Sequence, residues 1–271
     1  MNSQSFLSKV KDFLINDKKE IPRGFLKNLK NKKFQIIKTH KNNTSLVYMI
    51  KEDIFRKFST NKRGIKKIKD ESQGIKWYQK KSRPTFHFLK KTVIKSKYGF
   101  IDTKKISGVK KKSWRPLREN YSFLLQAFRH YKKIFKGEKK TKIHGDLTLD
   151  NIYFSRKKVV FFDWEFFGSN QKHYGYDLAY LFLSAIILPT LAGKKISKED
   201  EICFIKLWRI LITEKISKKI IKDPFSFYIT TIKKDKVLNE GYKISKKKFF
   251  PFLIQRKIKN EINKLIKSAI C

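Results

Sequence analysis

The sequence has few residues of several kinds, and each shortage excludes a class of protein. Its 271 residues include two cysteines, Cys203 and Cys271, so we do not expect a disulfide framework. We expect the protein in a reducing compartment, the cytoplasm. It has no long apolar run: residues 178–192 are too few to cross a bilayer and are interrupted by Pro189. We therefore expect a buried helix there. Residues 1–16 are amphipathic, which argues against a signal peptide.

Acidic residues are also scarce. The chain has 23 Asp and Glu against 66 Lys and Arg, and a formal net charge of +43. Such an excess favours anionic partners, namely nucleotides, nucleic acid, phosphorylated glycans or an acidic membrane surface. Because 56 of the basic residues are lysine, an AT-rich genome explains the excess equally well. The lysines are scattered without a basic segment interleaved with aromatic residues, so no specific nucleic-acid partner is expected.

What the chain does contain is a folded core and one informative stretch. Hydrophobic residues make up 40% of the sequence, which favours a globular protein over a disordered one. Residues 143–168, IHGDLTLDNIYFSRKKVVFFDWEFFG, place Asp146 five residues before Asn151, and Asp163 after a VVFF run. In a loop H-x-D-x-x-x-x-N, the Asp accepts the proton of an attacking hydroxyl and the Asn binds Mg²⁺. An Asp after a short strand supplies a second oxygen ligand. The combination indicates phosphoryl transfer.

These motifs resemble those of the aminoglycoside phosphotransferase and choline kinase group, which shares the bilobal protein-kinase fold. Gly145 stands where protein kinases carry Arg, and Asp163-Trp164-Glu165 stands where they carry Asp-Phe-Gly. Asp177, in GYDLAYLFL, matches a family Asp that begins a hydrophobic helix. The resemblance covers about residues 34–190.

The resemblance implies a role for each matched residue. Asp146 would be the catalytic base, and Asn151 and Asp163 would be the metal ligands. His144 would be a structural member of the loop. ATP and Mg²⁺ are the implied cofactors, with GTP as an alternative nucleotide.

The expected fold is α+β and bilobal. Residues 1–110 would form a small β-rich lobe, with a basic helix in residues 1–30 followed by a nucleotide-binding sheet and helix. Residues 111–271 would form a larger, mainly helical lobe. β-type runs and apolar periodicity predict the individual elements: strands at 34–40, 44–50 and 54–59, and helices at 66–81, 117–135 and 197–221.

The first turn of the expected sheet, KNNTS, lacks the glycines with which a Gly-rich loop holds phosphates. The available substitutes are the backbone amides of Asn43, Thr44 and Ser45, together with Lys41. Ile106–Val109 is the candidate segment for binding adenine through its backbone, with Ile106 and Gly108 as the residues involved.

Lys57 is the candidate for the lysine that holds the α- and β-phosphates, with Glu71, fourteen residues later, as its partner on the following helix. Arg56 faces the opposite side of the same strand, and a shift of register would exchange the two. A solvent-facing helix position is the alternative for Glu71.

We expect a soluble phosphotransferase that moves the γ-phosphate of ATP to a hydroxyl of a small molecule or glycan. Few acids follow Asp177, so the acceptor is expected to be anionic or membrane-associated. The basic, amphipathic tail, 246–271, would pack on its own lobe or contact the inner face of a membrane. Alternatives are an inactive kinase-like scaffold, a basic nucleic-acid-binding protein and a protein kinase. The last is disfavoured because only thirteen residues separate Asp163 from Asp177.

Overall fold

The computed structural model describes residues 36–39, 45–51, 53–82, 88–135, 140–155, 158–168, 171–191, 193–214 and 252–270. The chain divides into two compact units. The first contains the chain up to Ser107 together with Asp163–Phe167, and the second contains the remainder. The basic helix predicted for residues 1–30 lies outside the described residues.

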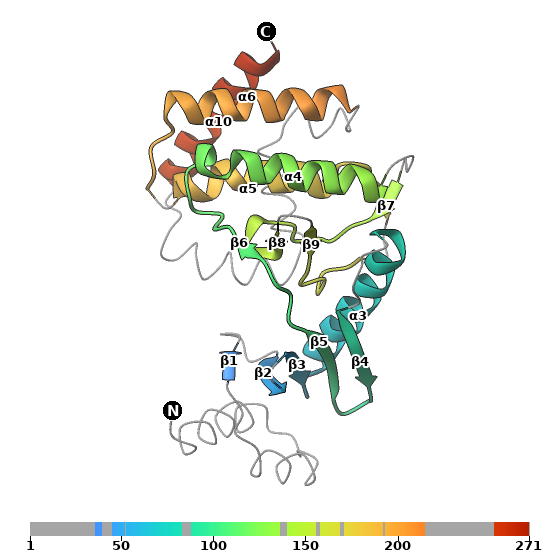
Figure 1. Ribbon diagram of the computed structural model, residues 1–271. Helices are drawn as coiled ribbons and strands as arrows, with labels where there is room; N and C mark the ends of the chain where they lie inside the picture. Colours follow the sequence, from blue (N-terminus) through green and yellow to red (C-terminus); the bar gives the residue numbers. More distant parts are fainter. Residues whose placement is uncertain are drawn as a thin grey trace. The chain divides into compact units, whose positions relative to one another are not determined.

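The first unit contains a five-stranded antiparallel sheet (Figure 1), with the strand order β1-β2-β3-β5-β4. Runs of β-branched and aromatic residues form these strands, because such side chains pack well on a pleated, half-buried surface. The three strands predicted from the sequence are present, and two more follow the helix. The strands are β1 Ile36–Thr39, β2 Leu46–Lys51, β3 Ile54–Ser59, β4 Leu89–Ile94 and β5 Gly99–Lys104.

Helix α3, Lys62–Ser82, packs on strands β3, β4 and β5. It buries one face, which includes Ile68 and Ile75, at the helical spacing that the sequence shows. Gly74 lies on this buried side, and a Cβ atom there would come within 2.6 Å of Trp164 Cβ and 2.9 Å of Phe167 Cβ. The missing side chain therefore lets the segment Asp163–Phe167 lie directly against α3, which explains why this segment belongs to the first unit.

The second unit is mainly helical. Its central helix is apolar all round, and a helix of this kind is normally buried. The residues of α5 from Leu178 to Leu183 are at most 4% exposed, so the prediction of a buried helix is confirmed. No helix in the described part of the chain is both long enough and apolar enough to cross a membrane. The helices are α4 Leu117–Phe135, α5 Tyr176–Leu191, α6 Lys198–Thr213 and α10 Phe252–Ile270.

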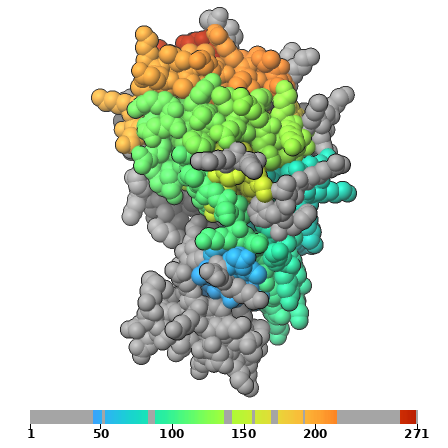
Figure 2. Space-filling model, viewed as in Figure 1, coloured from blue at the N-terminus to red at the C-terminus, as the bar shows by residue number. Residues whose placement is uncertain are grey.

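Helices α4 and α6 pack on each other and on α5, and α10 packs on α6 (Figure 1). Figure 2 shows the orange surface of α6 directly beside the green surface of α4. Ser197 and Asp200 form a capping box at the start of α6. Asp200 also accepts a hydrogen bond from the backbone N–H of Arg118 in the first turn of α4, at 2.8 Å. The described apolar residues of α10, such as Ile262 and Leu265, are buried. This confirms that the tail packs on its own unit.

Short strands complete the second unit: β6-β8-β9 form one antiparallel sheet, and β7 pairs with β10. The 3₁₀ turn η1, Leu149–Asn151, leads directly into β8. The predicted α+β fold, β-rich in its first part and mainly helical in its second, is therefore confirmed. The strands are β6 Val109–Lys110, β7 Lys140–Lys142, β8 Ile152–Phe154, β9 Val159–Phe161 and β10 Gln171–His173.

Candidate functional site

Lys57 lies at the centre of a buried group of charges in the first unit. Strand β3 carries it, and its side chain is 9% exposed. Its Nζ atom donates hydrogen bonds to Glu71 Oε2 at 2.9 Å, Asp163 Oδ1 at 3.1 Å and Glu165 Oε2 at 2.9 Å. An ammonium group has three N–H donors, so these carboxylates account for all of them. The structure thus brings the predicted residues Lys57, Glu71 and Asp163 together.

A second lysine completes this group. Lys67, on α3, donates to the other oxygen of Glu165, Oε1, at 3.0 Å. Its Nζ atom also lies 4.9 Å from the centroid of the Phe166 ring. Glu165 therefore bridges two lysines. We call Lys57, Lys67, Glu71, Asp163 and Glu165 the charge cluster; it has two positive and three negative side chains.

Burial and mutual attraction shift the pKa values in the charge cluster. Burial opposes the charge of Lys57, but Asp163, Glu71 and Glu165 together raise its pKa well above the ordinary value. Burial raises the pKa of Glu71 to about 7, against the opposing effect of Lys57. Burial also acts to raise the pKa of Glu165, but Lys57 and Lys67 hold it below the ordinary value. Glu165 is therefore the ionised partner on which both lysines depend.

Asp163 has an unusual backbone conformation. Its φ is 63°, and it is the one non-glycine residue with a positive φ in the described part of the chain. Asp tolerates this left-handed region better than most residues, and such conformations gather at functional sites. The next residue, Trp164, is fully buried, and its ring contacts those of Trp77 and Tyr78. This packing holds the turn and keeps the Asp163 carboxylate on Lys57.

Arg56, the alternative to Lys57, is committed elsewhere. Its Nε and Nη2 atoms donate to the two carboxylate oxygens of Asp102 at 2.6 and 2.7 Å. Asp102 stands opposite it on the neighbouring strand β5. Adjacent residues of a strand point to opposite faces, so Arg56 and Lys57 cannot share a site. Lys57 is the residue of this pair that contacts Glu71.

Asp146 and Asn151 meet in the second unit. The Nδ2 atom of Asn151 donates to the backbone oxygen of Asp146 at 2.8 Å and to its Oδ2 at 3.2 Å. The hydroxyl of Tyr180, on α5, lies 3.5 Å from Asp146 Oδ1. The hydrogen bonds of the Asn151 side chain use its nitrogen, which leaves the acceptor atom Oδ1 as the group that could bind a metal ion.

Asp177 anchors the loop that carries Asp146. Its Oδ2 accepts the backbone N–H of His144 at 2.8 Å, and its Oδ1 accepts that of Gly145 at 3.0 Å. Burial raises the pKa of Asp177 to about 6, although these two N–H groups act in the opposite direction. Gly145 has a φ of 88°, a left-handed conformation that glycine adopts without strain. This explains physically why glycine suits the position.

His144 is 1% exposed, and its Nε2 lies 2.8 Å from the backbone oxygen of Phe162, the residue before Asp163. It therefore ties the loop of Asp146 to the end of β9. Asp150 accepts the backbone N–H of Ser113 at 3.2 Å, which attaches the loop to the segment before α4.

The other predicted nucleotide-binding residues are less informative. Lys41, Asn43 and Thr44 all lie outside the described residues. Ser45 is 1% exposed, and its Oγ has no hydrogen-bond partner in the described part of the chain. Ile106 is half-buried and Gly108 is exposed. Their roles at a nucleotide stay predictions.

No three His, Cys, Asp or Glu residues among those described form a group that could hold a metal ion. Mg²⁺ is usually bound through one or two protein oxygens, with substrate phosphates and water completing its shell. The carboxylate of Asp163 and the amide oxygen of Asn151 are donors of the type that Mg²⁺ prefers. Each of these two oxygens is chemically suited to this ion; Asp163 belongs to the first unit and Asn151 to the second.

No family model matches the chain. No curated protein matches it in sequence. Solved structures do resemble it. The GDP complex of aminoglycoside 2'-phosphotransferase-IIIa has a TM-score of 0.48 and 11% identity over 99% of this chain and 98% of that one. The choline kinase LicA from Streptococcus pneumoniae has a TM-score of 0.46 and 14% identity over 91% and 97%. An ethanolamine kinase from Plasmodium vivax has a TM-score of 0.43 and 14% identity over 91% and 85%. These are members of the group that the motifs resemble.

Sequence reasoning missed several contacts of the candidate site. The sequence identified Glu165 as the last residue of the Asp-Trp-Glu motif. It did not predict that Glu165 contacts Lys57 and Lys67. Tyr180 was not recognised beside Asp146. One signal was available for Tyr180: it follows Asp177 by three residues, so a helix that begins near Asp177 places both side chains on one face.

Proposed function

We propose that the protein is a phosphotransferase that moves the γ-phosphate of ATP, with Mg²⁺, to a hydroxyl of a small molecule or glycan. The observation that carries this proposal is the pair of hydrogen bonds from Lys57 Nζ to Glu71 and Asp163. Phosphoryl transfer in this fold needs a lysine for the phosphates, a carboxylate that orients it and a carboxylate for the metal ion. A merely structural ion pair has no need of the third group.

In this proposal Lys57 holds the α- and β-phosphates, and Glu71 keeps its ammonium in place. Asp163 and Asn151 are the proposed oxygen ligands of Mg²⁺. When bound, this ion neutralises charge on the phosphates. In the state described here, all three N–H groups of Lys57 are used by carboxylates, so binding a phosphate requires Lys57 to release one of them.

Asp146 is the proposed general base. Its carboxylate accepts the proton of the acceptor hydroxyl, and Asn151 Nδ2, 3.2 Å from its Oδ2, restricts its orientation. Asp177 holds the backbone of the same loop through the N–H groups of His144 and Gly145. The chain's own residues thus position a single carboxylate for proton transfer.

Phosphate transfer from γ-labelled ATP, measured with Asp146→Asn, tests the proposal. We expect turnover to fall by about 10²–10⁴-fold, as is typical when a general base is lost. The nucleotide affinity should stay within about twofold, because Asp146 is not a proposed metal ligand. Asp150→Asn is the matched control: it removes one carboxylate from the same loop but keeps an oxygen for Ser113, and it should remain active. Wild-type turnover in Asp146→Asn, or an equal loss in the control, would contradict the proposal.

The proposed acceptor is anionic or membrane-associated. Glu199, Asp200 and Glu201 are the acids clustered after Asp177, and they lie in the first turn of α6. Asp200 is buried and engaged with Arg118, so it is not available to bind a cationic substrate. Steady-state kinetics with choline, an aminoglycoside and phosphorylated sugars compare the classes directly. Efficient turnover of a cation that is insensitive to added salt would exclude an anionic acceptor.

A further inference from the structure

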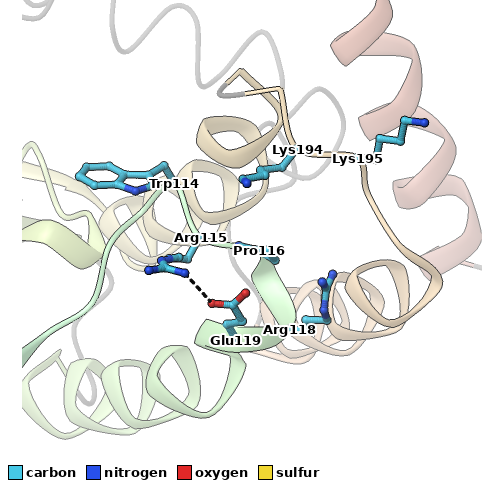
Figure 3. A pocket seen from close by; sticks show the side chains of 7 residues that line it. All are labelled: Trp114, Arg115, Pro116, Arg118, Glu119, Lys194 and Lys195. Atoms are coloured by element: carbon cyan, nitrogen blue, oxygen red, sulfur yellow. Dashed lines mark ion pairs between the residues drawn. The ribbon is translucent and has the colours of Figure 1, made fainter.

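The second unit contains a pocket of about 360 Å³ that none of the proposed catalytic residues lines (Figure 3). It lies where the segment before α4 and the first turn of α4 meet the segment between α5 and α6. Four of its seven lining side chains are cationic and one is acidic. The lining residues are Trp114, Arg115, Pro116, Arg118, Glu119, Lys194 and Lys195.

The charges of this pocket are only partly balanced. Glu119 lies 3.8 Å from Arg115, and Asp200, just outside the pocket, lies 2.8 Å from Arg118. Lys194 and Lys195 form no ion pair with any residue that the structure describes, and both are exposed. The lining residues alone carry a net charge of +3, Asp200 lowers this to +2, and Glu199 also interacts with Arg118 from outside the pocket. This local excess matches a dianion, and it is distinct from the high charge of the whole chain.

Arg118 is held in position before any ligand arrives. Its Nη1 atom donates to Asp200 Oδ2 at 2.8 Å and to Ser197 Oγ at 3.1 Å. The Asp200 side chain is 3% exposed and that of Arg118 is 43% exposed, so a buried carboxylate anchors a guanidinium that is partly open to solvent. A guanidinium that is already fixed loses little conformational freedom when its remaining N–H groups bind an anion. Arg118 is therefore a preorganised part of the pocket.

Trp114 gives the pocket an apolar surface. It is 49% exposed, although indole side chains are usually well buried. Figure 3 shows the side chain of Lys194 pointing toward Trp114, whereas that of Lys195 extends away. Lys112 Nζ lies 5.0 Å from the centroid of the Trp114 ring and covers part of its surface, and the remaining exposed surface beside Lys194 suits a ligand that joins a ring to an anionic group.

We propose that this pocket binds a phosphate monoester of a small ring compound, such as a sugar phosphate. The phosphate lies by Lys194 and the guanidinium of Arg118, and the ring packs on Trp114. The volume fits, since small-molecule sites are typically about 300–1,000 Å³. A phosphate monoester carries a charge of about −1.5 to −2 at neutral pH, close to the local excess. The site stands independently of the phosphotransferase activity.

Titration calorimetry on the full chain tests the site with glucose 6-phosphate, inorganic phosphate and uncharged glucose. Glucose 6-phosphate should bind in a saturable manner, and glucose should not bind. Lys194→Ala should weaken glucose 6-phosphate binding by about tenfold, because one close charge is lost. The matched control is Lys264→Ala, which removes an exposed lysine from α10. It should change the affinity by less than about twofold, because distant exposed charges are screened.

A second variant separates the ring contact from the charge. Trp114→Leu should weaken glucose 6-phosphate binding several-fold while leaving the affinity for inorganic phosphate unchanged. Lys194, Lys264 and Trp114 are exposed, so the three single variants should fold and keep the wild-type circular dichroism spectrum. An equal loss in Lys264→Ala would show that the overall charge attracts the anion and would overturn the site. Non-saturable binding to the wild type, or an unchanged affinity in Lys194→Ala, would overturn it as well.

Discussion

Neutralising Glu165 should destabilise the first unit strongly, because it is the shared partner of two buried lysines. In Glu165→Gln the side chain keeps its shape but loses its charge. Lys57 retains Glu71 and Asp163, whereas Lys67 has no other carboxylate partner among the described residues. Removing one partner of a buried ion pair typically costs about 3–5 kcal/mol. We expect a loss of about 3 kcal/mol, at the lower end of that range, because an amide oxygen still accepts a hydrogen bond.

Urea denaturation at neutral pH measures this loss, followed by tryptophan fluorescence; Trp77 and Trp164, two of the four tryptophans, lie in the first unit. The matched control is Asp70→Asn, which breaks the ion pair of Asp70 with Lys66 on the same helix. The side chain of Lys66 is 75% exposed, so this pair should contribute about 0–1 kcal/mol. The comparison isolates the effect of burial within one helix.

A double replacement tests the cause. Lys67→Met combined with Glu165→Leu removes both charges and fills a similar volume, so most of the loss should be recovered. With the single variants Lys67→Met and Glu165→Leu, a double-mutant cycle gives the coupling energy between Lys67 and Glu165. A loss below about 1 kcal/mol in Glu165→Gln would show that the cluster behaves like a solvent-exposed pair. A double variant no more stable than the single one would show that packing, and not the unpaired charge, controls stability.

Three further substitutions have defined outcomes. Gly74→Ala should lower the melting temperature, since overpacking against Trp164 costs about 1–3 kcal/mol and outweighs a gain of about 1 kcal/mol in helix propensity; an unchanged melting temperature would contradict this contact. Asp163→Ala should abolish Mg²⁺-dependent ATP binding in calorimetry, and undiminished affinity would exclude Asp163 as a metal ligand. Asn151→Ala should weaken MgATP binding less than Asp163→Ala, because a neutral amide oxygen carries no formal charge; an equal or larger loss would reverse the proposed ranking.

The regular elements could be predicted because their patterns are local. Apolar residues at helical spacing after Pro116 predicted a helix at 117–135, and α4 has these bounds. The strand predicted at 54–59 also has its predicted bounds. Period-2 alternation placed Arg56 and Lys57 on opposite faces, and the separation of fourteen residues between Lys57 and Glu71 suited a pairing of strand and helix. These predictions succeed because neighbouring residues determine them.

The rest of the charge cluster could not be predicted in this way. Lys67 and Glu165 are 98 residues apart in the sequence, and nothing in either local pattern points to the other. They meet because the segment Asp163–Phe167 packs against α3, where Gly74 leaves room for it. A glycine inside a helical pattern is weak evidence alone, since it has several explanations. The sequence likewise did not predict that this segment belongs to the first unit.

Asp177 provides a test based on pH. It is 1% exposed, and among the described residues its hydrogen-bond partners are the two backbone N–H groups of His144 and Gly145, so burial raises its pKa from 3.8 to about 6. A group whose pKa is raised by folding contributes stability below its unfolded pKa and loses that contribution as the pH rises through its folded pKa. The contribution of Asp177 should therefore be complete near pH 3.8 and lost by about pH 7.

The variant Asp177→Asn does not titrate at this position, so the difference between its unfolding free energy and that of the wild type isolates Asp177. At about 1.4 kcal/mol for each pKa unit, the wild type should lose on the order of 3 kcal/mol relative to the variant between pH 4 and pH 7. Urea denaturation at several pH values across this range measures the difference. The variant itself should be less stable by a constant amount, because its amide accepts only one of the N–H groups of His144 and Gly145. A difference that is constant with pH, or that changes in favour of the wild type as the pH rises, would mean that these two N–H groups outweigh burial and keep Asp177 ionised.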